Sequence, residues 1–275
     1  MKAKQLFFDT MKYIALLIGT FVVFFPLYSV FVGAFKTRQE FYINRLSLPS
    51  TWNFENFSIA WEKGDLALGL GNTLFILIVS IVGNVLIGSM SAYALGRFEF
   101  KGRNLIIGSY LVAAVIPLIT TQVVTYSVIK ALGLYNTYGA PIALYLGADV
   151  IQLTIYLQFI RNIPYELDEA AMMEGASLFK IFRSVIFPLL GPATATVVIL
   201  KFITIYNDFY VPYLYMPDRG LRTVATAIQS FVGPNAARME VISAYILLIF
   251  IPTIVMFLFM QRYIFSGVTS GAVKS

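Results

Sequence analysis

The sequence contains neither cysteine nor histidine, and only 12% of its 275 residues are charged. The lack of both residue types excludes disulfides, thiol nucleophiles, histidine-based acid–base catalysis and the common zinc sites. The shortage of charge excludes a water-soluble globule, because 59% of the residues are hydrophobic and too few polar side chains remain to cover a surface. The basic residues are scattered rather than gathered in a stripe, which argues against nucleic-acid binding. We therefore expect a membrane protein that is not an enzyme and binds no metal.

Six apolar runs are each long enough to form a helix across a bilayer, which takes about 20 residues. Strands of a membrane barrel would alternate in polarity over about 10 residues, whereas these runs are apolar on all sides. The pattern predicts an all-α polytopic membrane protein with six transmembrane helices within residues 13–263. The expected spans are residues 13–35, 72–95, 105–129, 139–160, 189–207 and 241–263.

The distribution of Lys and Arg between the short loops predicts the orientation of the chain. Residues 96–104 carry three basic residues, whereas the next loop carries only Lys130. Since basic loops stay on the cytoplasmic side, both termini are expected to be cytoplasmic. Residues 1–12 then form a cytoplasmic N-terminus, residues 161–188 a cytoplasmic loop and residues 264–275 a cytoplasmic tail.

The loop at 161–188 is the least membrane-like stretch in the second half of the chain. Pro164 suits the first turn of a helix, and the three acidic residues that follow favour its positive end. Gly175 can end this helix in a left-handed conformation, and Ser177 can cap a second helix over Leu178–Phe187. From these residues alone, the loop is either an ordinary amphipathic connector or a docking element for a groove on a partner protein.

Three separated motifs resemble those of one family of membrane proteins. Glu169-Ala170-Ala171, then Gly175 and Val185-x-Phe187-Pro188, resemble the EAA loop of ABC-type import permeases, E-A-A-x3-G-x9-I-x-L-P. Tyr206-Asn207-Asp208-Phe209 is similar to the W-N-D-F of MalG-like carbohydrate permeases. The ending, from Gln261-Arg262-Tyr263 to Lys274, resembles the Q-R-Y…G-x-T-x-G-A-V-K tail of that family. The likeness extends over nearly the whole chain.

This resemblance implies an ABC importer type I permease fold and one half of the translocation pathway of an ATP-driven sugar importer. It implies four kinds of partner in a bacterial or archaeal plasma (inner) membrane: a second homologous permease subunit, two ATP-binding cassette subunits, an extracytoplasmic sugar-binding protein and membrane lipid. ATP and Mg²⁺ would bind the cassette subunits, because this chain has no G-x4-G-K-[ST] phosphate loop and is expected to bind no cofactor. The family motif assigns contact with a cassette subunit to Glu169, Ala170, Ala171, Gly175 and Pro188.

Asp149 and Lys201 lie inside predicted spans, where ionisable groups are costly and need partners or water. They can form an ion pair between neighbouring helices, or they can line a cavity. Tyr145, Asp149, Gln152 and Tyr156 follow one another at helical spacing and are predicted to share one face of span four. Aromatic rings stack on sugar rings, and carboxylates and amides bind hydroxyls, so this face is a candidate for the substrate pathway.

Three further polar sites lie in or next to the spans. Pro117 predicts a kink in span three whose freed carbonyls bind nearby hydroxyls, and such an irregularity usually lines a cavity, which makes Gln122 a candidate. Asn207 lies at the outer end of span five, where it can contact substrate or cap the helix. Asn84 is expected to form a hydrogen bond between helices rather than to contact substrate. A secondary transporter that uses Asp149 and Lys201 for ion coupling is the alternative function.

Overall fold

The computed structural model describes residues 2–232 and 237–272, which are almost entirely helical. The chain divides into two compact units. The first comprises Met1–Ala67 and Ala227–Ile254, and the second comprises Leu68–Thr226 and Val255–Ser275. The prediction of an all-α membrane protein is confirmed.

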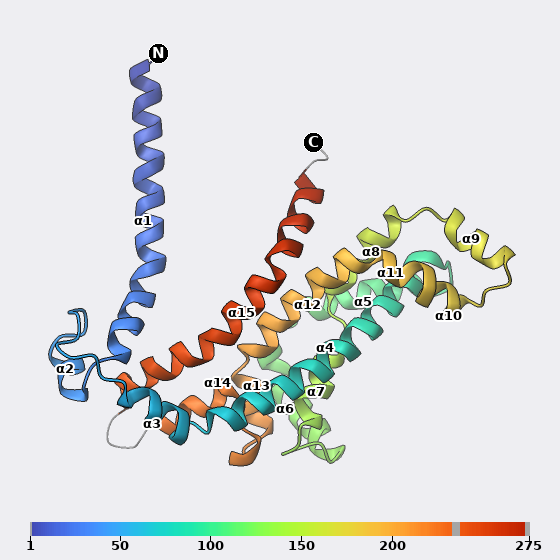
Figure 1. Cartoon of the computed structure of the whole chain (residues 1–275). Helices are drawn as coiled ribbons and strands as arrows, with labels where there is room; N and C mark the ends of the chain where they lie inside the picture. Colours follow the sequence, from blue (N-terminus) through green and yellow to red (C-terminus); the bar gives the residue numbers. More distant parts are fainter. Residues whose placement is uncertain (1, 233–236, 273–275) are drawn as a thin grey trace. The chain divides into compact units, whose positions relative to one another are not determined.

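The helices follow one another with short connections (Figure 1). Their bounds are α1 Lys2–Ala34, α2 Arg38–Ile43, α3 Glu55–Lys63, α4 Leu66–Arg97, α5 Arg103–Val115, α6 Leu118–Ala131, α7 Gly139–Leu146, α8 Val150–Asn162, α9 Glu166–Met173, α10 Leu178–Ile181, α11 Phe187–Leu189, α12 Gly191–Tyr206, α13 Tyr210–Tyr215, α14 Val224–Ala227 and α15 Met239–Ala272. A π-helical turn occupies Phe182–Ile186, and 3-10 turns occupy Arg219–Leu221 and Ile228–Phe231.

Within the described residues, three helices are long and apolar enough to cross a bilayer, and there are up to six crossings if each bent pair counts as one. The three are Phe7–Ala34, Leu66–Arg97 and Met239–Phe259. The bent pairs are α5 with α6, α7 with α8, and the segment Leu178–Leu189 with α12, at 111°, 44° and 76° respectively. Of the predicted cytoplasmic ends, residue 1 and residues 273–275 lie outside the described residues.

In the first unit, a polar cluster closes the end of α1. The Asn56 side chain donates to the carbonyls of Ala34 and Lys36, at 2.9 and 2.8 Å. The buried Lys36 ammonium in turn donates to the carbonyl of Asn44 and to the hydroxyl of Ser47. These bonds satisfy carbonyls that a helix end leaves without partners, and they fix the turn into α2.

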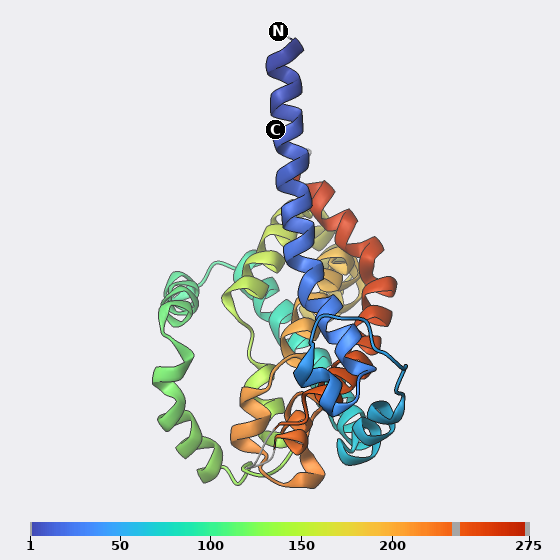
Figure 2. The ribbon, with the colours of Figure 1, turned by 90° about the vertical axis from the view of Figure 1, so that its left-hand side faces the viewer.

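In the second unit, side chains of α4 bind several other segments. Asn72 donates to the carbonyls of Gly220 and Arg222, and Asn84 donates to those of Tyr145 and Gly147. Gly88 leaves the space that the Gln152 amide occupies, because a Cβ at this position would overlap that amide. Figure 2 shows α5 and α6 to one side of the other helices of this unit.

Candidate functional site

The helix α9 is short, capped and largely exposed. Glu166, Asp168 and Glu169 lie in its first turn, where the helix dipole favours acidic groups. At its other end, Gly175 has φ +78°, and its N–H donates to the Met172 carbonyl, while the next N–H donates to the carbonyl of Ala171. These two bonds form a Schellman cap, and the predicted left-handed end at Gly175 is confirmed.

The segment after α9 differs from the prediction. Ser177 caps α10 by accepting the N–H of Lys180, as expected. The second helix predicted over Leu178–Phe187 is present, but it is not α-helical throughout, because a π-helical turn at Phe182–Ile186 lies between α10 and α11. Pro188 has no N–H, and its ring crowds the carbonyl four residues earlier, so a widened turn before it relieves the conflict.

The motif residues lie on or next to the exposed part of this loop. Glu169, Ala170, Gly175 and Pro188 are exposed, and Ala171 is half-buried. Met173 stands 89% exposed beside them. An exposed helix with small and acidic residues on its surface offers a contact face for another protein.

One residue of α9 is buried instead. The Asp168 carboxylate is 1% exposed and lies against the last turns of α4. It accepts a hydrogen bond from the Tyr93 hydroxyl at 2.9 Å and lies 3.2 Å from the Arg97 guanidinium. Arg97 also donates to the carbonyl of Ile163 at 2.9 Å and lies over the ring of Tyr165. We call Tyr93, Arg97 and Asp168 the Asp168 cluster.

A break separates α7 from α8 in the second unit. Asp149 caps α8, with one carboxylate oxygen 2.8 Å from the N–H of Gln152. The Asn84 amide donates to the carbonyls of Tyr145 and Gly147, at 3.1 and 2.8 Å. The helix interruption therefore has partners for its freed backbone groups, as non-helical backbone at membrane depth requires. The predicted interhelical role of Asn84 is confirmed.

We expect Asn84→Leu to lower the free energy of unfolding of the chain by about 1–3 kcal/mol, because it removes the donor that the fully buried Asn84 side chain gives to the carbonyls of Tyr145 and Gly147. Leucine keeps much of the side-chain volume. The measurement is the thermal midpoint of the purified protein in detergent. Asn207→Leu is the matched control, because the Asn207 amide is exposed and donates only within its own helix, to the carbonyl of Ile203. Equal midpoints for the two variants would contradict the assigned role.

The break also separates the residues that were predicted to share one face of span four. A single helical face through Tyr145, Asp149, Gln152 and Tyr156 is wrong, because Gly147 has an extended conformation and interrupts the helix. Gln152 is buried, and its amide donates to the Asn84 carbonyl. Tyr156 is fully buried, and its hydroxyl donates to that of Thr194. Tyr145 and Asp149 instead face a cavity.

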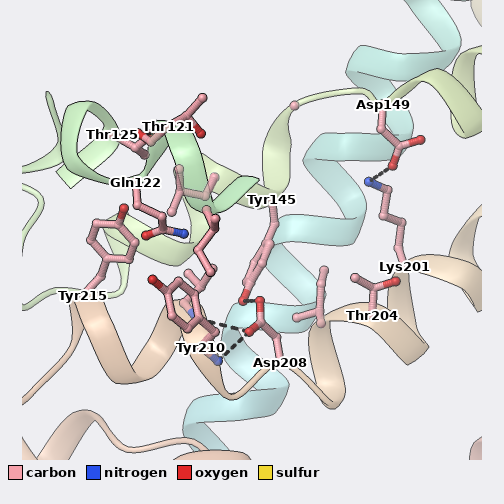
Figure 3. A pocket seen from close by; sticks show the side chains of 15 residues that line it. Thr121, Gln122, Thr125, Tyr145, Asp149, Lys201, Thr204, Asp208, Tyr210 and Tyr215 are labelled. Carbon is pink, nitrogen blue, oxygen red and sulfur yellow. Dashed lines mark hydrogen bonds and ion pairs between the residues drawn. The ribbon is translucent and has the colours of Figure 1, made fainter. Parts of the chain in front are cut away.

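This cavity has a volume of about 600 Å³ and lies entirely within the second unit (Figure 3). Hydroxyl, amide, carboxylate and ammonium groups border it together with aromatic rings. Its lining includes Thr121, Gln122, Thr125, Tyr145, Asp149, Lys201, Thr204, Asp208, Tyr210 and Tyr215. A smaller cavity of about 130 Å³ adjoins it, and Asp149, Lys201 and Thr204 border both.

Lys201 and Asp149 form an ion pair at the edge of the cavity, with 2.7 Å between the ammonium and the carboxylate. Asp208 binds the Tyr145 hydroxyl at 2.8 Å and accepts the N–H groups of Tyr210 and Val211 (Figure 3). The ion pair and cavity-lining roles considered for Asp149 and Lys201 are therefore both present. Asn207 lies outside the lining and binds its own helix.

Two polar atoms at the cavity are buried and have no hydrogen-bond partner among the residues that the structure describes. They are the carbonyl oxygen of the Gln122 side chain and the hydroxyl of Tyr215. Burial raises the pKa of the Tyr215 phenol, and the nearby Tyr210 adds to the rise. The phenol therefore stays protonated at neutral pH and can donate as well as accept. Buried polar atoms of this kind normally have partners, which water or a ligand with hydroxyl groups in the cavity would supply.

The kink predicted at Pro117 is present between α5 and α6, and the Thr120 hydroxyl donates to the Pro117 carbonyl at 2.7 Å. This bend carries the polar residues of α6 into the cavity lining, as Figure 3 shows for Thr121, Gln122 and Thr125.

A family described as the inner membrane component of binding-protein-dependent transport systems matches residues 2–270. The chain belongs to this family. The permease is 34% identical to the melibiose/raffinose/stachyose import permease protein MelC of Bacillus subtilis, over 91% of each chain. It is 36% identical to the trehalose transport system permease protein SugB of Mycobacterium tuberculosis, over 82% of this chain and 84% of that one.

The probable starch degradation products transport system permease protein AmyC of Thermoanaerobacterium thermosulfurigenes is 31% identical, over 90% of this chain and 91% of its own. A chain in the crystal structure of a bacterial ABC transporter involved in the import of the acidic polysaccharide alginate has the same fold. Its TM-score is 0.82 at 19% identity, over 94% of this chain and 96% of that one. The permease is thus a multi-pass transport component of the inner membrane and not an enzyme. Its family acts together with an ATPase and a substrate-binding protein.

Sequence patterns did not single out the Asp168 cluster. An acidic residue in a first turn is sufficiently explained by the helix dipole, and a basic residue in a cytoplasmic loop is sufficiently explained by the orientation of the chain. No sequence pattern indicates that Tyr215 lines the cavity, because Tyr215 and Gln122 are far apart in the sequence and no local spacing relates them.

Proposed function

We propose that the permease forms one half of the transmembrane pathway of an ATP-driven sugar importer. The observation that carries the proposal is the family match over residues 2–270, together with an exposed, capped helix at the family's coupling motif. Three relatives with 31–36% identity are named for the transport of sugars or starch products, which supports a carbohydrate substrate.

The proposed assembly contains a second homologous permease subunit, two ATP-binding cassette subunits that hold ATP and Mg²⁺, and an extracytoplasmic sugar-binding protein. Both termini and the loop at residues 161–188 lie in the cytoplasm, and the six spans lie within residues 13–263. The basic loop at residues 96–104 supports this orientation, because it adjoins the Asp168 cluster and so lies on the same side as α9.

In this proposal, α9 sits in a cleft of a cassette subunit. Glu169 pairs with a basic group across the contact, Ala170 and Ala171 allow close approach, and the Gly175 cap makes the helix a short rigid body. Closing of the cassette dimer moves the cleft, and α9 carries the displacement to the membrane helices.

Sugar passes along the cavity of the second unit. Gln122, Tyr145, Asp149 and Lys201 are the pathway residues that the geometry supports, joined by Tyr215. Aromatic rings can stack on the C–H face of a sugar, and the unpartnered oxygens of Gln122 and Tyr215 can bind its hydroxyls. The buried position of Tyr156 and the position of Asn207 outside the lining support structural roles for these two. Gln152 is buried and borders the smaller adjoining cavity, where its side-chain oxygen has no partner among the described residues.

The test is uptake by the whole complex reconstituted in proteoliposomes. We expect at least one labelled neutral oligosaccharide, from a panel of raffinose, trehalose and maltotriose, to accumulate when ATP is supplied. Accumulation should stop on ATP depletion and survive an ionophore that collapses ion gradients. Uptake that follows the ion gradient would favour a secondary transporter instead, and uptake of amino acids but no sugar would refute the substrate class.

A further inference from the structure

The Asp168 cluster joins the coupling loop to a helix that is distant in the sequence. Tyr93 and Arg97 come from the last turns of α4, whereas Asp168 belongs to α9. One hydrogen bond and one ion pair join α4 to α9, from the Tyr93 hydroxyl and the Arg97 guanidinium to the Asp168 carboxylate. A second hydrogen bond runs from Arg97 to the carbonyl of Ile163, before α9. Arg97 also lies over the Tyr165 ring, with 5.6 Å from its guanidinium carbon to the ring centre. The contacts hold both the helix and the segment that leads into it.

This attachment is confined to one buried residue of α9. The other two acidic residues of its first turn, Glu166 and Glu169, are exposed, whereas Asp168 is 1% exposed. The Arg97 side chain is 8% exposed, so the pair is shielded from water. Removal of one partner from such a pair leaves a buried charge without compensation, and the contact therefore strongly favours a single position of α9.

The helix α4 leads from this cluster to the cavity. It runs without a break from Leu66 to Arg97. Asn84 lies nine residues before Tyr93, which is about 14 Å along a helix. The Asn84 amide holds the carbonyls of Tyr145 and Gly147 at the break, and Tyr145 lines the cavity. Side-chain bonds thus connect α9 to the cavity wall through one uninterrupted helix.

We infer that Asp168 is a positioning residue that fixes the coupling helix to α4, so that movement of α9 reaches the cavity through α4 and Asn84. This inference rests on the proposed function, because it needs a cassette subunit to move α9. It adds a second route to the chain connections of α9 with α8 and α10. The contact face at Glu169 and Ala170 is separate from the buried cluster. Loss of the cluster therefore leaves α9 bound to the cassette subunit, but movement of α9 is no longer passed on to α4.

The test compares Asp168→Asn with Glu166→Gln in the complete reconstituted complex. Both changes remove one negative charge from the first turn of α9, but only Asp168 bonds to α4. We expect Glu166→Gln to keep the wild-type number of sugars imported per ATP hydrolysed. For Asp168→Asn we expect ATP hydrolysis within about twofold of wild type and a fall of about tenfold in sugars per ATP, since docking persists and transmission fails.

Tyr93→Phe removes one bond and keeps the ion pair, so it provides a milder variant if Asp168→Asn does not assemble. We expect an intermediate ratio of sugars to ATP. Wild-type ratios in both assembled variants, or parallel losses of hydrolysis and uptake, would overturn the inference and leave a purely structural contact. A wild-type complex that imports no sugar with ATP would instead refute the proposed function, so that the two failures are distinguishable.

Discussion

Replacement of Gly175 by leucine is expected to abolish sugar uptake while the permease still inserts and assembles. Gly175 has φ +78°, a conformation that costs a residue with a Cβ roughly 1–2 kcal/mol. The space around it is open, so the effect comes from the backbone and not from a clash. Loss of the cap unwinds the end of α9, and the leucine side chain enters the proposed contact with the cassette subunit. We expect uptake in proteoliposomes to fall at least tenfold.

Gly133→Leu is the matched control for this substitution. Gly133 also has a positive φ, +69°, with open space around it, and it follows the end of α6, outside the loop at residues 161–188. Its substitution carries the same backbone cost without touching the coupling loop. Ala170→Asp, which adds an acid to the exposed face beside Glu169, should resemble Gly175→Leu. Wild-type uptake by Gly175→Leu and Ala170→Asp would refute the coupling role of α9.

Neutralising only one member of the Asp149–Lys201 pair is expected to reduce the amount of assembled permease severely. Lys201→Met leaves a carboxylate within the membrane without its counter-charge, and Asp149→Asn leaves an ammonium without one. An unpaired charge at that depth costs about 2.5–3.5 kcal/mol on insertion scales, which corresponds to a drop of about a hundredfold in the folded population. Asparagine caps helices as well as aspartate does, so Asp149→Asn tests the charge and spares the cap of α8.

The double variant Asp149→Asn/Lys201→Met should restore assembly, because it leaves no unpaired charge at this site. Lys130→Met is the control for loss of a positive charge, since Lys130 is exposed at the end of α6. Size-exclusion chromatography of the solubilised complex measures assembly, and uptake is then measured on equal amounts. Single variants that assemble as well as the double variant would show that the pair does not stabilise the fold. Slow uptake by a fully assembled double variant would assign the pair to the pathway.

Features determined by local chemistry could be read from the sequence. The lengths of the apolar runs gave the helical membrane fold, and Gly175, Ser177 and Pro117 predicted a left-handed cap, an N-cap and a kink that the structure contains. Each of these depends on the residue itself and its near neighbours. The coupling motif also lies in one continuous segment, and its contact with a cassette subunit stays a prediction.

Features that depend on distant partners could not be read in this way. The break at Gly147 is stable because Asn84, more than sixty residues earlier, donates to the carbonyls that the break sets free. Local helical spacing therefore placed Gln152 and Tyr156 on the same face as Tyr145, and the structure separates them. The contacts of Asp168 with α4 could not be predicted either, because the helix dipole alone explains an acidic residue in a first turn.

The two carboxylates beside the cavity have little free capacity to accept hydrogen bonds from a sugar. Asp208 already accepts three hydrogen bonds, and Asp149 already accepts an ammonium and an amide. We therefore expect the cavity to hold a solute weakly, since transit needs release on the far side. Tight recognition would then be the task of the substrate-binding protein rather than of the permease.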